Sequence, residues 1–159
     1  MTVLTAIVAF ILVFGAIVFV HELGHFLAAK AVGVRPFEFA IGFGPALWSR
    51  RWGETIYYLR VIPLGGYVRL LGMDPMEEEG GAGDKHKQNP EDLDDPRSFA
   101  RKPLWARLFI IAAGPLMNFV FAALLFMALA ATIEVPLTVY RVEPGSPAAE
   151  AGIEAGDVL

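Results

Sequence analysis

Two long stretches of apolar residues set the outline of the chain. Residues 3–20 carry no charge, and Thr5 and Gly15 are the only interruptions within them; residues 108–133 carry no charge either. Both stretches are long enough to cross a lipid bilayer as helices. They predict a first transmembrane helix over residues 1–33, ended by Gly33, and a second within residues 99–134, after a basic and aromatic juxtamembrane segment. Because the N-terminus has no basic segment and no cleavage-site pattern, we expect the first helix to be retained.

Residues 34–72, between the two spans, show the patterns of strands and turns. Alternating, β-branched and aromatic side chains indicate strands, whereas Gly and Pro indicate the breaks between them. The three predicted strands are residues 37–41, 55–62 and 67–71. The predicted breaks are Gly42, Gly44, Pro45 and residues 63–66. The segment is therefore predicted to form a small membrane-associated β-meander.

Two roles are open for this meander. An exposed edge could hold an extended peptide by main-chain hydrogen bonds, or the meander could be a structural cover for the end of the first helix. The candidate residues for holding a peptide are Leu64, Gly65, Gly66, Tyr67 and Val68.

Two further segments are polar. Residues 73–98 are acidic and rich in Gly and Pro, so they predict a disordered cytoplasmic loop in which His86 is solvated. Residues 135–159 read as a strand, a turn, a short helix at 147–152 and a second strand. This pattern predicts the beginning of a soluble domain whose remainder is not in the sequence.

The distribution of basic residues predicts the orientation of the chain. Of 13 Lys and Arg residues, only Arg141 follows the second span and none precedes the first. The positive-inside rule then places residues 34–107 in the cytoplasm and both termini outside. The net charge of −4 gives no support for nucleic-acid binding, and the 55% hydrophobic content is too high for a typical soluble domain. The absence of cysteine excludes a disulfide framework and a thiolate metal site.

The candidate chemistry lies at the end of the first apolar stretch. Along a helix His21 and His25 are four residues apart and share one face, so both imidazoles can bind one Zn²⁺. Glu22 is close enough to take a proton from a water held there. The alternative is a chance pair of histidines that caps a membrane helix. Because ionisable groups are costly at membrane depth, we favour the zinc site.

The second apolar stretch contains two residues that are unusual in a membrane helix. Pro115 is expected to bend the helix and to free a carbonyl group. Asn118 is a polar side chain at membrane depth, which either bonds the helices together or faces the reaction site and its substrate.

Four segments, in this order along the chain, resemble the site-2 protease family of intramembrane metalloproteases, of the bacterial regulator of sigma-E protease type. They are the histidine motif at 21–25, the glycine-containing segment 63–68, the second-span segment 113–119 and the segment 142–159, which looks like the opening of a PDZ domain. The resemblance implies an α-helical multi-pass membrane protein with a small β-meander between two transmembrane helices, followed by the start of a PDZ domain.

The resemblance also implies that His21 and His25 are zinc ligands and that Glu22 is the general base and acid. It implies hydrolysis of peptide bonds in membrane-anchored substrates, such as anti-sigma factors or signal-peptide remnants, at a bacterial inner membrane. The family takes its third ligand from an aspartate in a Leu-Asp-Gly type motif, and the sequence contains none. We therefore expect this chain to be the N-terminal part of a longer protease, inactive alone.

Two other functions stay open at this point. One is a membrane-anchored zinc protease whose site lies in water, which needs a third ligand in a soluble domain. The other is a membrane-anchored binding module of PDZ type, in which the zinc motif is vestigial. The binding module explains the C-terminal segment but not the histidine pair.

Overall fold

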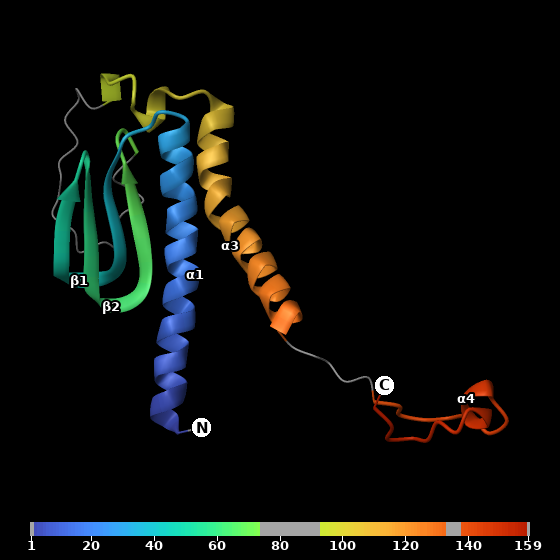
Figure 1. Ribbon diagram of the computed structural model, residues 1–159. Coiled ribbons are helices and arrows are strands. Elements are labelled where there is room, and N and C mark those ends of the chain that lie inside the picture. Colours follow the sequence, from blue (N-terminus) through green and yellow to red (C-terminus); the bar gives the residue numbers. More distant parts are fainter. Residues whose placement is uncertain (1, 74–92, 133–137, 159) are drawn as a thin grey trace. The chain divides into compact units, whose positions relative to one another are not determined.

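The computed structural model describes residues 2–73, 93–132 and 138–158. In chain order its elements are α1 (Val3–Ala31), β1 (Pro36–Trp52), β2 (Thr55–Leu70), the short 3-10 helix η2 (Phe99–Arg101), α3 (Leu104–Thr132) and α4 (Pro147–Glu150) (Figure 1). The chain divides into two compact units, Met1–Ala122 and Ala123–Leu159, which are described separately.

Helix α1 confirms the first predicted helix. Its 29 residues extend over about 43 Å at ~1.5 Å per residue, more than the ~30 Å of a bilayer's hydrocarbon core. The Thr5 N–H donates to the hydroxyl of the N-cap Thr2 at 3.3 Å, and Gly33 ends the helix at a positive φ of 69°. The side chains of its first half are exposed. Such a surface needs an apolar cover, which a lipid bilayer supplies.

Helix α3 confirms the second predicted helix and begins at Leu104, four residues before the apolar stretch that starts at residue 108. It remains helical through Pro115. Both α1 and α3 are long and apolar enough to cross a membrane. The carbonyl that Pro115 leaves without its helical donor is that of residue 111, four positions earlier.

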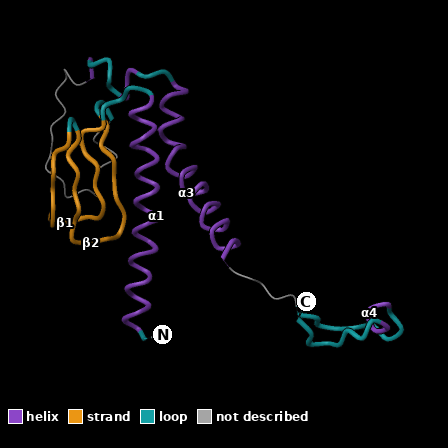
Figure 2. The backbone as a smooth tube through the Cα atoms, in the orientation of Figure 1, coloured by secondary structure: helices purple, strands orange, loops and turns teal. Residues whose placement is uncertain are grey.

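The prediction of three separate strands was wrong. Two long strands are present, and each folds back on itself (Figure 2). Gly42 and Gly44 lie inside β1 with φ of 86° and 81°, and Gly65 lies inside β2 with φ of 96°. Glycine adopts positive φ without steric cost, so these residues bend the strands and do not end them.

The folded-back strands give one stretch of β2 two neighbours. Tyr57 is opposite Phe39 on one side and Arg50 on the other, and Leu59 is likewise opposite Ile41 and Trp48. The final stretch of β2 pairs with the start of β1: Gly66 is opposite Ile41, Tyr67 opposite Ala40 and Val68 opposite Phe39. The sheet is therefore wider than its two strands suggest, and residues 66–68 lie on the side that approaches α1.

The core lies where the second half of α1 meets both the sheet and α3. Its buried members are Ala28, Ala29, Val34, Leu70 and Ile110. The alanines on α1 are small enough for the neighbouring elements to approach closely. This packing fixes α1 between the end of β2 and the start of α3.

The predicted acidic loop differs from the structure at its end. Residues 74–92, including His86, lie outside the described residues. Ser98, in contrast, is fully buried, and the main chain from 97 to 99 bonds to its neighbours: Arg35 N–H donates to Arg97 O at 3.1 Å and Phe99 N–H to Leu71 O at 2.6 Å. Ordered structure therefore starts before residue 99.

The second unit contains α4, which confirms the predicted short helix. Ser146 caps it by accepting a hydrogen bond from Ala149 N–H at 3.3 Å. An isolated antiparallel bridge joins Thr138 to Val158. Residues 138–142, the described part of the first strand predicted there, form no longer strand, and residues 135–137 lie outside the described residues. Assignment of this unit to a PDZ domain stays a prediction.

Candidate active site

Helix α1 brings the two histidines of the motif together. The Nε2 atoms of His21 and His25 are 3.2 Å apart, and their rings are nearly perpendicular, at 77°. Two nitrogen ligands at ~2.0–2.1 Å from one tetrahedral zinc ion lie about 3.3 Å apart. The separation of the two Nε2 atoms therefore fits a shared zinc ion.

The other nitrogen of each ring contacts α3. His25 Nδ1 is 2.7 Å from the main-chain oxygen of Ile110, and because a carbonyl only accepts, Nδ1 carries the proton. His25 Nε2 is then unprotonated, the form in which imidazole binds a metal. His21 Nδ1 is 3.2 Å from the side-chain nitrogen of Asn118. Asn118 thus lies at the histidine pair. A position facing the reaction site was one of the two alternatives that the sequence left open for this residue.

A glycine of α3 leaves the space in front of the two imidazoles open. A Cβ atom added at Gly114 would meet His25 Nε2 and would lie 2.8 Å from His21 Nε2. Any side chain at this position would collide with both imidazoles and force them to move. The sequence reasoning gave Gly114 no role, although Gly114 and Asn118 are four residues apart and so share a helix face.

A second glycine lets the helices come this close. A Cβ atom at Gly24, between the two histidines, would meet Ala113 O and lie 2.9 Å from Met117 Cβ. Gly24 and Gly114 therefore allow α1 and α3 to pack with almost no space between their backbones.

Glu22 points to a different neighbour. One residue along a helix corresponds to a rotation of about 100°, which turns Glu22 away from α3 and toward the sheet. A Cβ atom at Gly66 of β2 would lie 2.9 Å from Glu22 Cγ and 3.2 Å from Val18 Cγ1. The Glu22 side chain thus lies against Gly66 of β2.

The five residues predicted to hold a peptide all lie in β2, but their surroundings differ from one another. Gly66 is next to Glu22, and Leu64 is half exposed. Gly65 faces the ring of Phe43. The Tyr67 side chain is engaged elsewhere: its hydroxyl accepts from Arg60 Nη2 at 2.8 Å, and burial raises the pKa of Tyr67. Gly66 is therefore placed next to Glu22, and the main chain of residues 66–68 stays the candidate peptide-holding edge.

Within the described residues, no group of three His, Cys, Asp or Glu side chains could hold a metal ion. The chain supplies two neutral nitrogen donors, whereas catalytic zinc sites use three protein ligands. The donors present fit zinc, and a third ligand is needed from elsewhere.

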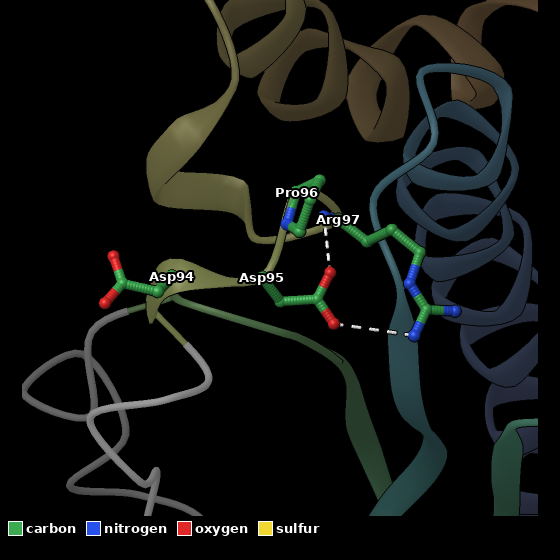
Figure 3. A pocket seen from close by; sticks show the side chains of 4 residues that line it. All are labelled: Asp94, Asp95, Pro96 and Arg97. Carbon is green, nitrogen blue, oxygen red and sulfur yellow. Dashed lines mark hydrogen bonds and ion pairs between the residues drawn. The ribbon is translucent and has the colours of Figure 1, made fainter.

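An open hollow of about 660 Å³ lies on another part of the surface, lined by Asp94, Asp95, Pro96 and Arg97 (Figure 3). The main-chain N–H of Arg97 donates to Asp95 at 2.7 Å and lowers the pKa of that carboxyl. Arg97 also donates to Glu54 at 2.8 Å. These contacts tie the segment before η2 to the turn between β1 and β2.

Comparison with known proteins places the chain in a family. Residues 9–152 match the model of Peptidase family M50. The chain therefore belongs to this family, the site-2 protease family, as its histidine motif indicated. M50 proteins are embedded in membranes, in agreement with the two apolar helices.

Two relatives illustrate the likeness. A protein of Thermotoga maritima is 42% identical over 154 residues, which cover 96% of this chain and 28% of the relative. A protein of Clostridium acetobutylicum is 42% identical over 154 residues, covering 96% of this chain and 41% of the relative. Both carry the name "Putative zinc metalloprotease". The chain thus spans less than half the length of these curated relatives.

Proposed function

We propose that this chain supplies the first part of the active site of a membrane-embedded zinc metalloprotease, with His21 and His25 as zinc ligands and Glu22 as general base and acid. The observation that carries the proposal is the 3.2 Å separation of the two Nε2 atoms beside Glu22, with Gly114 keeping the space in front of them open. Membership of Peptidase family M50 supports it.

Each residue then has a defined task. Bound zinc supplies a Lewis acid that polarises a peptide carbonyl and lowers the pKa of a coordinated water to ~7. Glu22 takes the proton from the attacking water and delivers it to the leaving amine nitrogen. His25 is oriented by the carbonyl of Ile110. The missing ligand, an aspartate in the family, comes in this proposal from the part of the protein beyond this chain.

The sheet edge beside Glu22 gives the substrate a place. An α-helical substrate keeps its carbonyls hydrogen-bonded, so it must unwind before cleavage. The main chain of Gly66, Tyr67 and Val68 pairs with β1 on one side, and no other strand of the described residues pairs with it. The Glu22 side chain lies over the face of this strand at Gly66. An unwound segment could add there as a further strand. The proposed substrates are membrane-anchored proteins of the anti-sigma-factor or signal-peptide-remnant class, cut near the cytoplasmic face.

The test uses the full-length protein in membranes and a membrane-anchored reporter substrate. Glu22→Gln keeps the size of the side chain but cannot accept the proton, so cleavage should fall by at least ~100-fold. The protein should retain its zinc. The matched control is Glu54→Gln, on the exposed β1–β2 turn, which should cleave normally. Cleavage at the wild-type rate by Glu22→Gln contradicts the proposal. Unchanged zinc content and partner binding in His21→Ala would favour the binding-module alternative.

A further inference from the structure

The sheet carries charged side chains on the face that is turned away from α1. Phe39 contacts aromatic rings of α1, and successive side chains of a strand point to opposite faces, so Glu38 points away from the helix. Arg69 is opposite Glu38 in the sheet and shares that face. Glu38, Arg60 and Arg69 are all buried, with exposed fractions of 5%, 7% and 7%. Charged side chains are almost never buried this fully unless they are paired, so this face holds charges with specific contacts.

Arg60 connects two parts of the sheet that belong to different strands. Its Nη1 donates to Gly44 O at 2.7 Å, at the bend of β1, and its Nη2 donates to the Tyr67 hydroxyl at 2.8 Å, in the last stretch of β2. The guanidinium also lies 4.7 Å from the centre of the Tyr58 ring. Because a guanidinium is a rigid, planar fork of donors, it holds its two acceptors in a fixed relation to each other. Arg60 therefore ties the bend of β1 to the end of β2.

Tyr67 extends this connection to the start of β1. Its hydroxyl donates to Glu38 Oε2 at 3.4 Å, and the same oxygen of Glu38 is 3.5 Å from Arg69 Nη1. The guanidinium groups of Arg60 and Arg69 lie 5.7 Å and 5.5 Å from the centre of the Tyr67 ring. The contacts of this face thus converge on the Tyr67 side chain, and its hydroxyl joins a cation to an anion.

The residue held in this way lies next to Gly66 in the proposed peptide-holding edge. Gly66 faces α1, where an added Cβ atom would lie 2.9 Å from Glu22 Cγ, whereas the side chain of Tyr67 points to the opposite face. Gly65 and Gly66 precede Tyr67, and glycine restrains a backbone less than any other residue. The contacts of the Tyr67 hydroxyl on one face therefore fix the place of the main chain of residues 66–68 relative to Glu22 on the other.

We propose that Arg60 and Tyr67 are positioning residues that set the register in which a substrate strand adds to residues 66–68, and that they thereby select the peptide bond that is cut. The inference rests on the proposed function, in which the substrate pairs with this edge. A strand that slips by one residue turns all its side chains to the other face, whereas a slip by two residues keeps them on the same face. Loss of the contact between Arg60 and Tyr67 should therefore allow cleavage two residues from the wild-type position.

The experiment identifies the cut bonds by mass spectrometry of the products that the full-length protein, in membranes, forms from a membrane-anchored reporter. Tyr67→Phe removes the hydroxyl and keeps the ring. It should give a second product, cut two residues from the main site, and a KM ~10-fold higher with kcat within ~3-fold of wild type, as expected for loss of one hydrogen bond to a charged group. The matched control is Tyr57→Phe, whose ring packs on Phe26 and Phe39 on the face that meets α1. The control should cut only at the wild-type bond.

Arg60→Lys provides a second variant. Lysine keeps the positive charge but has no fork of donors, so it does not hold Gly44 O and the Tyr67 hydroxyl at once. Arg60→Lys should give the same second product, and adding Tyr67→Phe to it should change little, because both substitutions break one contact. Zinc content and the melting temperature of Tyr67→Phe should stay close to those of the wild type.

The outcomes separate this inference from the proposed function. A single cut at the wild-type bond in both Tyr67→Phe and Arg60→Lys overturns the positioning role, even where cleavage is slower, because the contacts then only stabilise the sheet. That result leaves the roles of Glu22 and the two histidines in place. Cleavage at the wild-type rate by Glu22→Gln removes the proposed function itself, and this inference with it.

Discussion

Helix α1 meets α3 on one face and the sheet on another, and the two contacts are built in different ways. Toward α3, individual atoms are matched: one imidazole nitrogen to the Ile110 carbonyl, another to Asn118, with Gly114 leaving room in front of the pair. Toward the sheet, α1 packs its side chains against aromatic rings and against the main chain of β2 without matching individual polar atoms. The Glu22 side chain lies against Gly66.

Aromatic packing dominates the sheet side. The ring of Phe39 is 6.0 Å from that of Phe19 and 5.4 Å from that of Phe26, both edge to face. Such contacts set how far the sheet lies from the helix without selecting a particular polar atom. In the proposed protease, the α3 side would therefore govern zinc binding and the sheet side would govern the position of the peptide.

The largest expected effect comes from Gly114→Ala, which tests whether the α3 side of α1 controls zinc binding. The added methyl group would meet His25 Nε2 and lie 2.8 Å from His21 Nε2. Zinc affinity should fall by more than ~100-fold, because the methyl group occupies the place of the ion. Zinc content after dialysis measures the effect. Gly15→Ala is the matched control, since a Cβ at Gly15 meets nothing within 4 Å. Retention of zinc by Gly114→Ala would show that the ion does not lie between the two imidazoles and α3.

The second prediction concerns the sheet side. In Gly66→Ala the new Cβ would lie 2.7 Å from Ala40 O and 2.9 Å from Glu22 Cγ, so the strand must shift away from α1. A displacement of ~1 Å can cost about 100-fold in rate, and we expect a 10–100-fold loss of cleavage with zinc affinity unchanged. Ser49→Ala, at an exposed position of β1, is the control. Should zinc affinity also fall, the two sides of α1 are not separable.

The smallest expected effect is on stability, and it comes from Arg97, which contacts neither α3 nor the face of α1 that meets the sheet. The Arg97 side chain lowers the pKa of Glu54, and its main-chain N–H lowers that of Asp95. The ordinary values are 4.5 and 3.8, so this stabilisation is complete above them and is lost as pH falls through the lowered values. Because these carboxyls are exposed, Arg97→Gln should lower the melting temperature only slightly at pH 7. At pH 3 this difference should shrink further. A large, pH-independent loss would mean that Arg97 acts through packing.

The sequence predicted the two helices from their uninterrupted apolar stretches, and it predicted from a spacing of four residues that His21 and His25 share one face. The roles of His21, Glu22 and His25 stay predictions. The sequence could not predict that β1 continues beyond residue 41. Glycines such as Gly42 and Gly44 usually mark the end of a strand, but here they have positive φ and bend the strand without ending it. The place of Gly114 also required the structure. Which face of α3 meets α1 is a property of the packed helices, although the spacing of Gly114 and Asn118 offered a hint.

The contacts that hold the two histidines differ in whether a point mutation can remove them. The carbonyl that orients His25 belongs to the main chain, and any residue placed at position 110 would carry the same oxygen. The group that contacts His21 is a side chain, which one codon change in Asn118 removes. A point mutation can therefore remove the contact to the His21 imidazole while the contact to the His25 imidazole stays in place.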